Sequence, residues 1–551
     1  MVAGMDKTRR MRLTKRPLAA LTLALGAAAL AGAAALSGSP AKPKTIDPLA
    51  GLIENGKNTR FERLMEYPNA AGTIGLAFVG EPFDTNSHPF FQPGPNGRSC
   101  VTCHQPKDAM SISTSTIQAL WARSGAKDPI FNPIDGANCP NLPRGSRASH
   151  SLLLDQGLFR IALPWPPKPL VGGAAETEFS IEVVSDPTGC NTSADFGIKS
   201  ANPAISVYRR PRMTGNLRYI DKPGQLYNAK TSLPLERDPE TGLHSSMSIM
   251  SDARATSLTA QARDAAGIHM GKVGNAPSPA GGDQASVHSG LGEFSREEMA
   301  KIIDFELKLH VAQNGDKLAG RFDAPNTPKA LGVEAMVKGE AGRIGNDRDT
   351  GVFFFFNEWK QRGQTGAKIG RTMKVAPGNR SALFRASVVR GYDLFFFESF
   401  WIRDTFGINS LPLGNPYKQT CAFCHSTQLT GGDVVPGWMD IGANNKPTAI
   451  AGMDKVLPTF KVTCKASALP HPYLGRVIYT HDPGRALISG RCRDVGSLVM
   501  QQFRGMAARA PYLSNGSAKD IRAVIDYYDT RYNIKYTEQN KQDLVNFLSV
   551  L

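Results

Sequence analysis

The pentapeptides CVTCH, at residues 100–104, and CAFCH, at residues 421–425, decide how this chain is interpreted. Both have the pattern C-x-x-C-H, which is the attachment motif for c-type haem. The two thiols add across the vinyl groups of the macrocycle, and the adjacent imidazole reaches the iron from the proximal side. The sequence therefore predicts two covalent haems c. Their attachment residues and proximal iron ligands are Cys100, Cys103 and His104, and Cys421, Cys424 and His425.

A zinc site or a redox dithiol is the alternative interpretation of a C-x-x-C pair. Zinc would require two more ligands at matching spacing, and a redox dithiol has no use for the histidine. Four further cysteines lie outside the motifs, and in an exported chain they are expected to form disulfides. Four cysteines can pair in three ways. The pairing Cys139–Cys190 with Cys464–Cys492 is preferred, because each pair lies within one half of the chain.

The first 41 residues have the layout of a secretory signal. Basic residues between Lys7 and Arg16 precede an apolar stretch from Pro17 to Leu36, and small residues follow up to Ala41. We expect cleavage near Ala41 and a periplasmic location. An uncleaved anchor is the alternative, because about 20 apolar residues can span a bilayer. No other stretch is comparably long and uncharged, so the mature protein is not expected to be integral to the membrane.

The composition indicates a globular protein of several domain-sized units. The chain has 551 residues, of which 41% are hydrophobic and 20% charged, and this excludes a disordered chain. The formal net charge is +16, but the basic residues are scattered and form no Lys/Arg-rich block. A solvated, mildly basic surface is therefore expected, without a nucleic-acid partner.

Hydrophobic periodicity and capping signals predict mostly helices. Helical patterns begin at Ser257, run from Ser295 to Gln313 with a capping box at Ser295, cover residues 379–397 and follow Thr537. Two strand-like runs occupy residues 158–163 and 179–184.

A helix ahead of C-x-x-C-H and a C-terminal helix pack crosswise in class I cytochrome c domains. The predicted fold is mainly α, with two such haem domains that carry loop-rich and small β insertions. The predicted boundaries are 1–41 for the signal, 42–330 for an N-terminal domain with an insertion at about 125–240, and 331–551 for a C-terminal domain.

Several longer motifs follow in an order that resembles the bacterial di-haem cytochrome c peroxidase superfamily, which includes the MauG-type enzymes and the rubber oxygenases. In the C-terminal half these motifs are RASVVRGYDLFF, CAFCH, DPGRALISGR, RGMAARAPYLSNGS and AVIDYYDTRY. NGRSCVTCHQP and SLTAQARDA support the resemblance in the N-terminal half. It covers residues 80–551 except for the insertion.

The resemblance implies that the two haems divide the work. The N-terminal haem, held by His104, would bind H₂O₂ or O₂, and the C-terminal haem, held by His425, would relay electrons from a small redox partner. Gln261 matches the family's pocket glutamine and is a candidate catalytic residue. The superfamily also often holds a calcium ion between its domains. For the second haem the family match gives Tyr528 as the distal iron ligand, with Met500 and Met506 as alternatives.

The chain departs from the family pattern around the first haem. The next histidine after His104 is His150, so no blocking ligand follows the motif closely. Ser251 stands where the family has an inter-haem tryptophan, and Gly271 stands where the peroxidases have a proton-moving glutamate. His269 is the candidate that replaces this acid. A surface or helix-capping histidine is the alternative.

These features lead to one leading function and two alternatives. The leading function is a periplasmic di-haem oxidoreductase that activates H₂O₂ or O₂. The first alternative is a rubber-oxygenase-like dioxygenase that acts on an apolar alkene, and the altered pocket favours it. The second is a non-enzymatic electron-transfer cytochrome, which the absence of an evident sixth ligand for the first haem disfavours.

Overall fold

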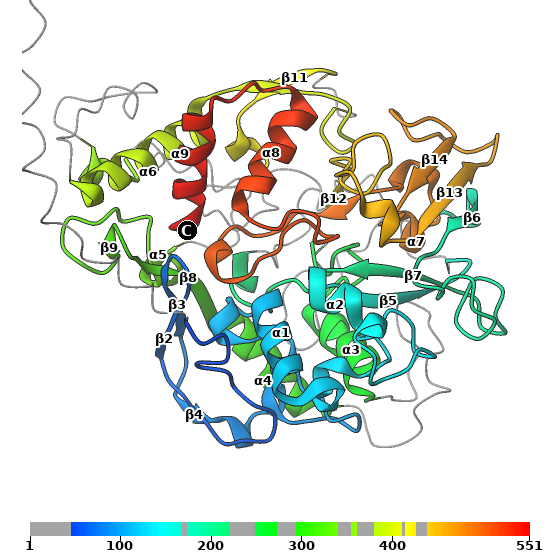
Figure 1. Ribbon diagram of the computed structural model, residues 1–551, viewed down its shortest axis with the longest axis horizontal. Coiled ribbons are helices and arrows are strands. Elements are labelled where there is room, and N and C mark those ends of the chain that lie inside the picture. The colour runs from blue at the N-terminus through cyan, green and yellow to red at the C-terminus, as the bar shows by residue number, and fades with distance from the viewer. Residues whose placement is uncertain are drawn as a thin grey trace, which may run out of the picture. The chain divides into compact units, whose positions relative to one another are not determined.

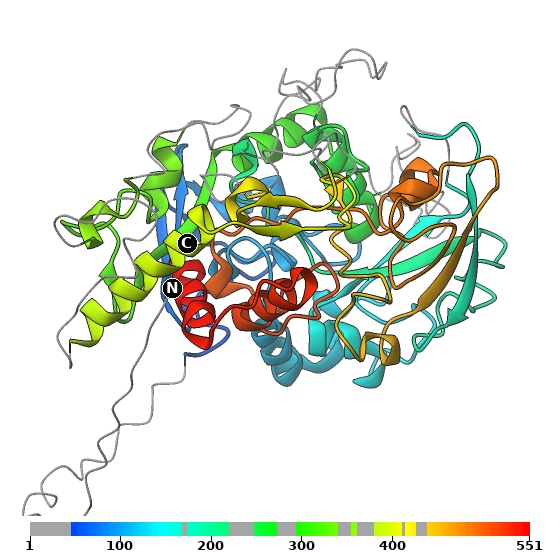
Figure 2. The same ribbon diagram turned by 90° about the horizontal axis from the view of Figure 1, so that it is seen from above.

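The computed structural model describes residues 46–167, 173–219, 246, 248–272, 294–339, 354–360, 379–409, 414–425 and 438–551 (Figures 1 and 2). The predicted signal lies outside these residues. Residues Ile46–Leu551 group into one compact unit. No helix within the described ranges is long and apolar enough to cross a membrane.

Helices α6 (Arg380–Phe397) and α9 (Glu538–Ser549) pack against each other, as the sequence predicts (Figure 1). Asn379 and Thr537 cap them. The crossing is close at Gly391, where an added Cβ would lie 2.6 Å from Cβ of Phe547 and still nearer the backbone of Asp543. Glycine is therefore required here because the two backbones approach each other.

The remaining helices confirm two further predictions and correct one. Helices α3 (Leu258–Met270) and α4 (Arg296–Lys308) begin where Ser257 and Ser295 predict, and Ser295 forms its capping box with Glu298. However, α4 ends at Lys308 rather than at Gln313. The other α-helices are α1 (Thr114–Ser124), α2 (Ser151–Gln156), α5 (Val333–Lys338), α7 (Ala486–Ser489) and α8 (Ile521–Tyr532).

The prediction of a mainly α fold is wrong. Helical turns of all kinds hold 33% of the described residues, and strands and bridges hold 19%. The largest sheet has the order β2 (Leu64–Pro68), β3 (Gly72–Phe78), β8 (Leu309–Asp316) and β9 (Gly320–Arg321). Strand β8 is nearly all buried and pairs antiparallel with β3. This pairing with a strand more than 200 residues earlier overrides the helical pattern of residues 309–313, since sheet partners and burial outweigh local propensity.

Both strand predictions in the insertion are confirmed to within one residue. Strand β5 (Phe159–Pro164) pairs with β7 (Ala204–Arg209). Strand β6 (Phe179–Ser185) joins a sheet with two strands from the C-terminal half, β13 (Thr459–Cys464) and β14 (Val477–Thr480). The short strand pairs are β1 (Arg60–Phe61) with β4 (Phe83–Asp84), β10 (Phe400–Ile402) with β11 (Tyr417–Gln419), and β12 (Trp438–Met439) with β15 (Leu498–Val499).

Both preferred disulfides are confirmed. Cys139 pairs with Cys190 at a Cα–Cα distance of 5.1 Å, and Cys464 pairs with Cys492 at 5.7 Å. These distances lie in the usual range. The four cysteines of the C-x-x-C-H motifs remain unpaired. The structure therefore separates the two sets of cysteines.

Two hydrophobic cores lie under the two motifs. One gathers buried residues from Ile53 to Val311 together with Ala508, and the other gathers buried residues from Ala319 to Leu551. Cys100 packs against the first core and Cys421 against the second.

Candidate functional site

The first motif folds into a tight turn that brings its side chains together. Residues Cys100–Thr102 form a 3-10 turn, and the His104 amide donates to the carbonyl of Cys100 at 3.0 Å. The Nδ1 of His104 lies 3.0 Å from the carbonyl of Met110. A proton on Nδ1 satisfies this carbonyl and leaves Nε2 as the free lone pair, which is how metal-ligating histidines are commonly oriented. Burial lowers the pKa of His104 to about 4, so its imidazole is neutral at physiological pH.

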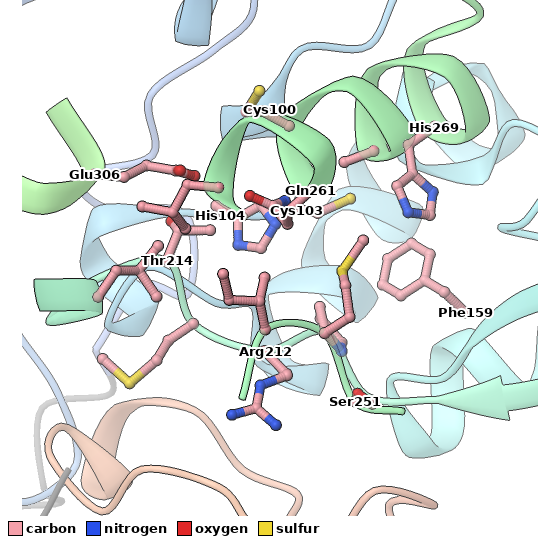
Figure 3. Close-up of a pocket in the computed structure, with 18 of the residues that line it drawn as sticks. Cys100, Cys103, His104, Phe159, Arg212, Thr214, Ser251, Gln261, His269 and Glu306 are labelled. Atoms are coloured by element: carbon pink, nitrogen blue, oxygen red, sulfur yellow. The ribbon is translucent and has the colours of Figure 1, made fainter. Parts of the chain in front are cut away.

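Cys100, Cys103 and His104 line one large cavity, called here the His104 cavity (Figure 3). The volume of this cavity is about 1370 Å³, including the part that is open to solvent. Most of its walls are apolar. The large apolar side chains that line it are Phe159, Ile161, Met213, Leu217, Ile249, Met250, Leu258, Met270, Phe294 and Ile302.

Both predicted catalytic residues lie in this cavity, on helix α3. Gln261 and His104 both line the cavity (Figure 3), and Oε1 of Gln261 is buried with no hydrogen-bond partner among the described residues. An unpaired buried acceptor is costly, so this amide is available to a bound group. His269 also lines the cavity, and about a third of its side chain is exposed.

His269 is oriented by a carboxylate that the sequence did not reveal. Its Nδ1 lies 2.5 Å from Oδ2 of Asp135, which also forms a buried ion pair with Arg98. Burial alone would raise the pKa of Asp135, but the charge of Arg98 and the hydrogen bond from His269 outweigh it and hold this pKa below its usual value. Asp135 lies 134 residues from His269, so no local signal connects them.

Glu306 is a second acidic residue that the sequence analysis missed. It lies on α4, is 3% exposed and lines the His104 cavity on the side opposite His269 (Figure 3). A signal was present, because Glu306 follows Ile302 by four residues and so falls within the apolar face of that helix. The cavity therefore contains a carboxyl group although Gly271 replaces the expected glutamate.

The structure shows where the residues lie at which the sequence differs from the pattern of the family it resembles. Gly271 ends α3 in the left-handed conformation, with φ of 71°. Ser251 lines the His104 cavity, and its carbonyl accepts from the amide of Val499 at 2.8 Å. His150 is not among the described residues that line the cavity, and its ring nitrogens contact the backbone carbonyls of Ser146 and Phe131.

The second motif forms the same turn in different surroundings. Residues Cys421–Phe423 form a 3-10 turn, and the His425 amide donates to the Cys421 carbonyl at 3.2 Å. The His425 ring stacks on Phe503 with 4.0 Å between ring centroids. Its Nδ1 is buried and has no hydrogen-bond partner in the described part of the chain. Burial lowers the pKa of His425 to about 3.

His425 borders two further cavities. The first, called the Cys421 cavity, measures about 740 Å³ and is lined by Cys421 and Cys424; among its described lining residues there is no Asp, Glu, Lys or Arg. The second, called the Arg509 cavity, measures about 950 Å³. Both volumes include space open to solvent.

The candidate distal ligands of the second site also lie here. Tyr528 and Met500 line both cavities beside His425, and Met506 lines the Arg509 cavity alone. Burial raises the pKa of Tyr528 well above its usual value. All three candidates therefore line a cavity that His425 borders, and the choice among them stays a prediction.

The two motif regions share a wall. Arg210 and Pro211 line both the His104 cavity and the Arg509 cavity. Arg212 lines the His104 cavity, and its guanidinium donates to the carbonyls of Val499 at 3.2 Å and Met500 at 2.9 Å.

The residues of both motifs fit covalent haem c. Each motif places two unpaired thiols and a neutral imidazole around cavities with largely apolar walls, and Gln261 offers a buried polar atom without a partner. Within the described ranges no group of three or more His, Cys, Asp or Glu side chains is arranged to hold a metal ion, so the calcium site stays a prediction. Comparison of the chain with protein-family models, with curated proteins and with solved structures finds no match.

Proposed function

We propose that the chain is a periplasmic di-haem c oxidoreductase that activates H₂O₂ or O₂ at its first haem site and relays electrons through its second. One observation supports this most strongly: the four motif cysteines stay unpaired beside His104 and His425, while the other four form disulfides. A haem bound at each motif supplies the redox chemistry of its iron.

In the first site the protein contributes an oriented ligand and groups that can move a proton. The Met110 carbonyl fixes the His104 ring. Gln261 provides an amide that can hydrogen-bond a small oxygen-containing ligand in the cavity. Asp135 holds the Nδ1 proton of His269, which leaves Nε2 to exchange a proton with that ligand. Glu306 provides a second route for a proton. A positioned acid–base group of this kind contributes about 10²–10⁴-fold to rate.

In the second site the protein contributes burial rather than proton transfer. His425 stacks on Phe503, and the Cys421 cavity has no charged lining residue in the described part of the chain. Uncharged, largely apolar surroundings offer no charged group for proton transfer and favour electron storage over chemistry on a substrate. A small redox protein or molecule is the expected electron partner.

Haem content tests this proposal directly. The chain is expressed with its leader and with cytochrome c maturation machinery, and the mature protein should lack about 41 residues and carry two haem masses. Replacing Cys100 and Cys103 together by serine should remove one haem, and replacing Cys421 and Cys424 should remove the other. The Cys139→Ser/Cys190→Ser variant is the matched control and should keep both. A wild-type protein with fewer than two haems would refute the proposal.

The rubber-oxygenase-like alternative is supported by the apolar walls of the His104 cavity, because an apolar alkene would be favoured there. Oxygen uptake in the presence of polyisoprene oligomers, compared with oxidation of electron donors by H₂O₂, separates the two reactions. Oxygen uptake that depends on the alkene supports the dioxygenase. Rapid peroxide turnover without any effect of the alkene supports the peroxidase, and the absence of both supports an electron carrier.

A further inference from the structure

Three arginines near the shared wall, the buried Arg210 and Arg509 and the half-buried Arg212, form no ion pair with any carboxylate in the described ranges. Arg210 donates to the carbonyls of Gly157, Ile112 and Arg509, and Arg212 donates to those of Val499 and Met500. Arg509 donates to the carbonyl of Gln502, and its Nε is buried without a hydrogen-bond partner among the described residues. Arg210 and Arg509 are 6% and 8% exposed, respectively.

Other buried arginines nearby are neutralised by acids. Arg209 forms ion pairs with Asp252 and Asp482, and Arg254 forms ion pairs with Asp252 and Asp264. Burial of a guanidinium is costly unless an anion compensates its charge. The fold supplies such anions to Arg209 and Arg254 but not to the three arginines at the wall. Arg160 is also buried without a carboxylate partner in the described ranges, but unlike Arg160 the three wall arginines line cavities that an external anion can enter to compensate their charge.

The positions of the three arginines place the anion in the His104 cavity and the Arg509 cavity. Arg212 lines the His104 cavity, Arg509 lines the cavity named after it, and Arg210 lines both. Figure 3 shows Arg212 on the side of the cavity opposite the Cys100 motif turn. Carboxylates are good partners here, because a guanidinium matches their geometry and the hydrogen bonds are charge-assisted.

We propose that Arg210, Arg212 and Arg509 form a carboxylate-binding site in the wall between the two motif regions, which holds the propionate groups of both bound haems. This inference rests on the proposed function. Arg212 serves the haem at His104, Arg509 serves the haem at His425, and Arg210 contacts a propionate of each. The wall thereby fixes how the two haems face each other and stabilises their reduced forms with positive charge.

Reduction potentials of the holoprotein test the site without reference to activity. A cation beside a haem favours the added electron, so Arg→Gln should lower the potential of the haem it serves. A unit charge at roughly 10 Å in a medium of effective dielectric constant about 20 changes the reduction equilibrium by about tenfold, which corresponds to about 59 mV for one electron. Spectroelectrochemical titration should show this shift for the first haem in Arg212→Gln, for the second in Arg509→Gln and for both in Arg210→Gln.

Matched variants give the controls. Arg160 is also buried but lines none of the three cavities, so Arg160→Gln should shift either potential less than the wall variants do. Arg210→Lys keeps the charge and should retain potentials close to those of the wild type. The two double Cys→Ser variants, each with one haem, assign the two signals. If Arg210→Gln does not fold, the other two Arg→Gln variants decide.

The outcomes separate this inference from the proposed function. A chain without haem refutes the proposed function and this inference with it. Two haems whose potentials do not move in any Arg→Gln variant refute the inference alone. A free anion is tested with inorganic phosphate at constant ionic strength. Phosphate-independent potentials in the wild type support bound propionates, whereas a phosphate response that the Arg→Gln variants abolish overturns that assignment.

Discussion

The two C-x-x-C-H motifs form the same turn but lie in opposite surroundings. In both, the histidine amide bonds back to the first cysteine carbonyl. The Nδ1 of His104 then meets a backbone carbonyl, whereas that of His425 has no partner among the described residues and its ring stacks on Phe503. The His104 cavity contains Glu306 and His269, and the Cys421 cavity has no charged lining residue in the described chain. The motif sets the shape of the turn, and the rest of the fold sets what surrounds it; in the proposed function this difference separates the site of oxidant chemistry from the site of electron storage.

The largest expected effect comes from removing each histidine. His104→Gly should abolish oxidant turnover and CO binding at the first site, because the iron loses its oriented ligand. His425→Gly should keep CO binding there while stopping turnover that uses an external electron donor. Absorption spectra with CO and steady-state assays give the measurement, and His150→Ala, outside the cavity, is the control. Loss of CO binding in His425→Gly but not in His104→Gly would reverse the two roles.

The second largest expected effect comes from replacing the group that moves a proton in the His104 cavity. His269→Ala should slow peroxide turnover by about 10²–10⁴-fold and flatten its pH profile, because it removes a positioned acid–base group. Glu306→Gln keeps shape and burial and should have a smaller effect. Stopped-flow mixing with H₂O₂ measures both variants. A larger loss in Glu306→Gln than in His269→Ala would transfer the role to the carboxyl group of α4.

The Asp135 carboxylate makes the stability of the first region depend on pH. Its folded-state pKa is held below that of the unfolded chain, so its contribution is present above the ordinary carboxyl pKa and is lost as the pH falls through the folded value. Asp135→Asn should cost about 3–5 kcal/mol at neutral pH, because Arg98 loses its buried partner. Urea unfolding between pH 3 and pH 7 measures this. Asp155→Asn removes an exposed ion pair with Arg147 and should cost at most about 1 kcal/mol. Equal costs for the two variants would contradict the prediction.

The smallest effect concerns the distal side of the second region. Tyr528→Phe should change the low-spin spectrum of the second haem and raise its potential, because phenolate stabilises ferric iron. Protein stability should change by less than about 1.5 kcal/mol, since the buried volume is nearly kept. Tyr532→Phe is the control, because the hydroxyl of Tyr532 is already bonded to Thr405. A spectral change in Met500→Leu but not in Tyr528→Phe would instead identify a methionine ligand.

Sequence reasoning was strongest where a feature is local. The Ser295 capping box, the Thr537 cap, the helix of residues 379–397 and the strand of residues 179–184 all depend on neighbouring residues, and all are found, the helix beginning one residue later. It failed at residues 309–313, because pairing with β3 decides their conformation. The mainly α fold class failed for the same reason, since strand pairing across the chain leaves little trace in a short window.

The sequence by itself determined the two C-x-x-C-H motifs, the separation of structural from motif cysteines, and the helix after Ser257 that carries Gln261. Only the tertiary structure decided what surrounds them. The Asp135–His269 contact spans 134 residues, and the arginine wall brings together Arg210 and Arg509, 299 residues apart. Spacing along the chain encodes a turn or a helix face, because these are fixed by neighbouring backbone bonds. Contacts across the fold depend on which distant surfaces are buried together, and only the folded chain determines that.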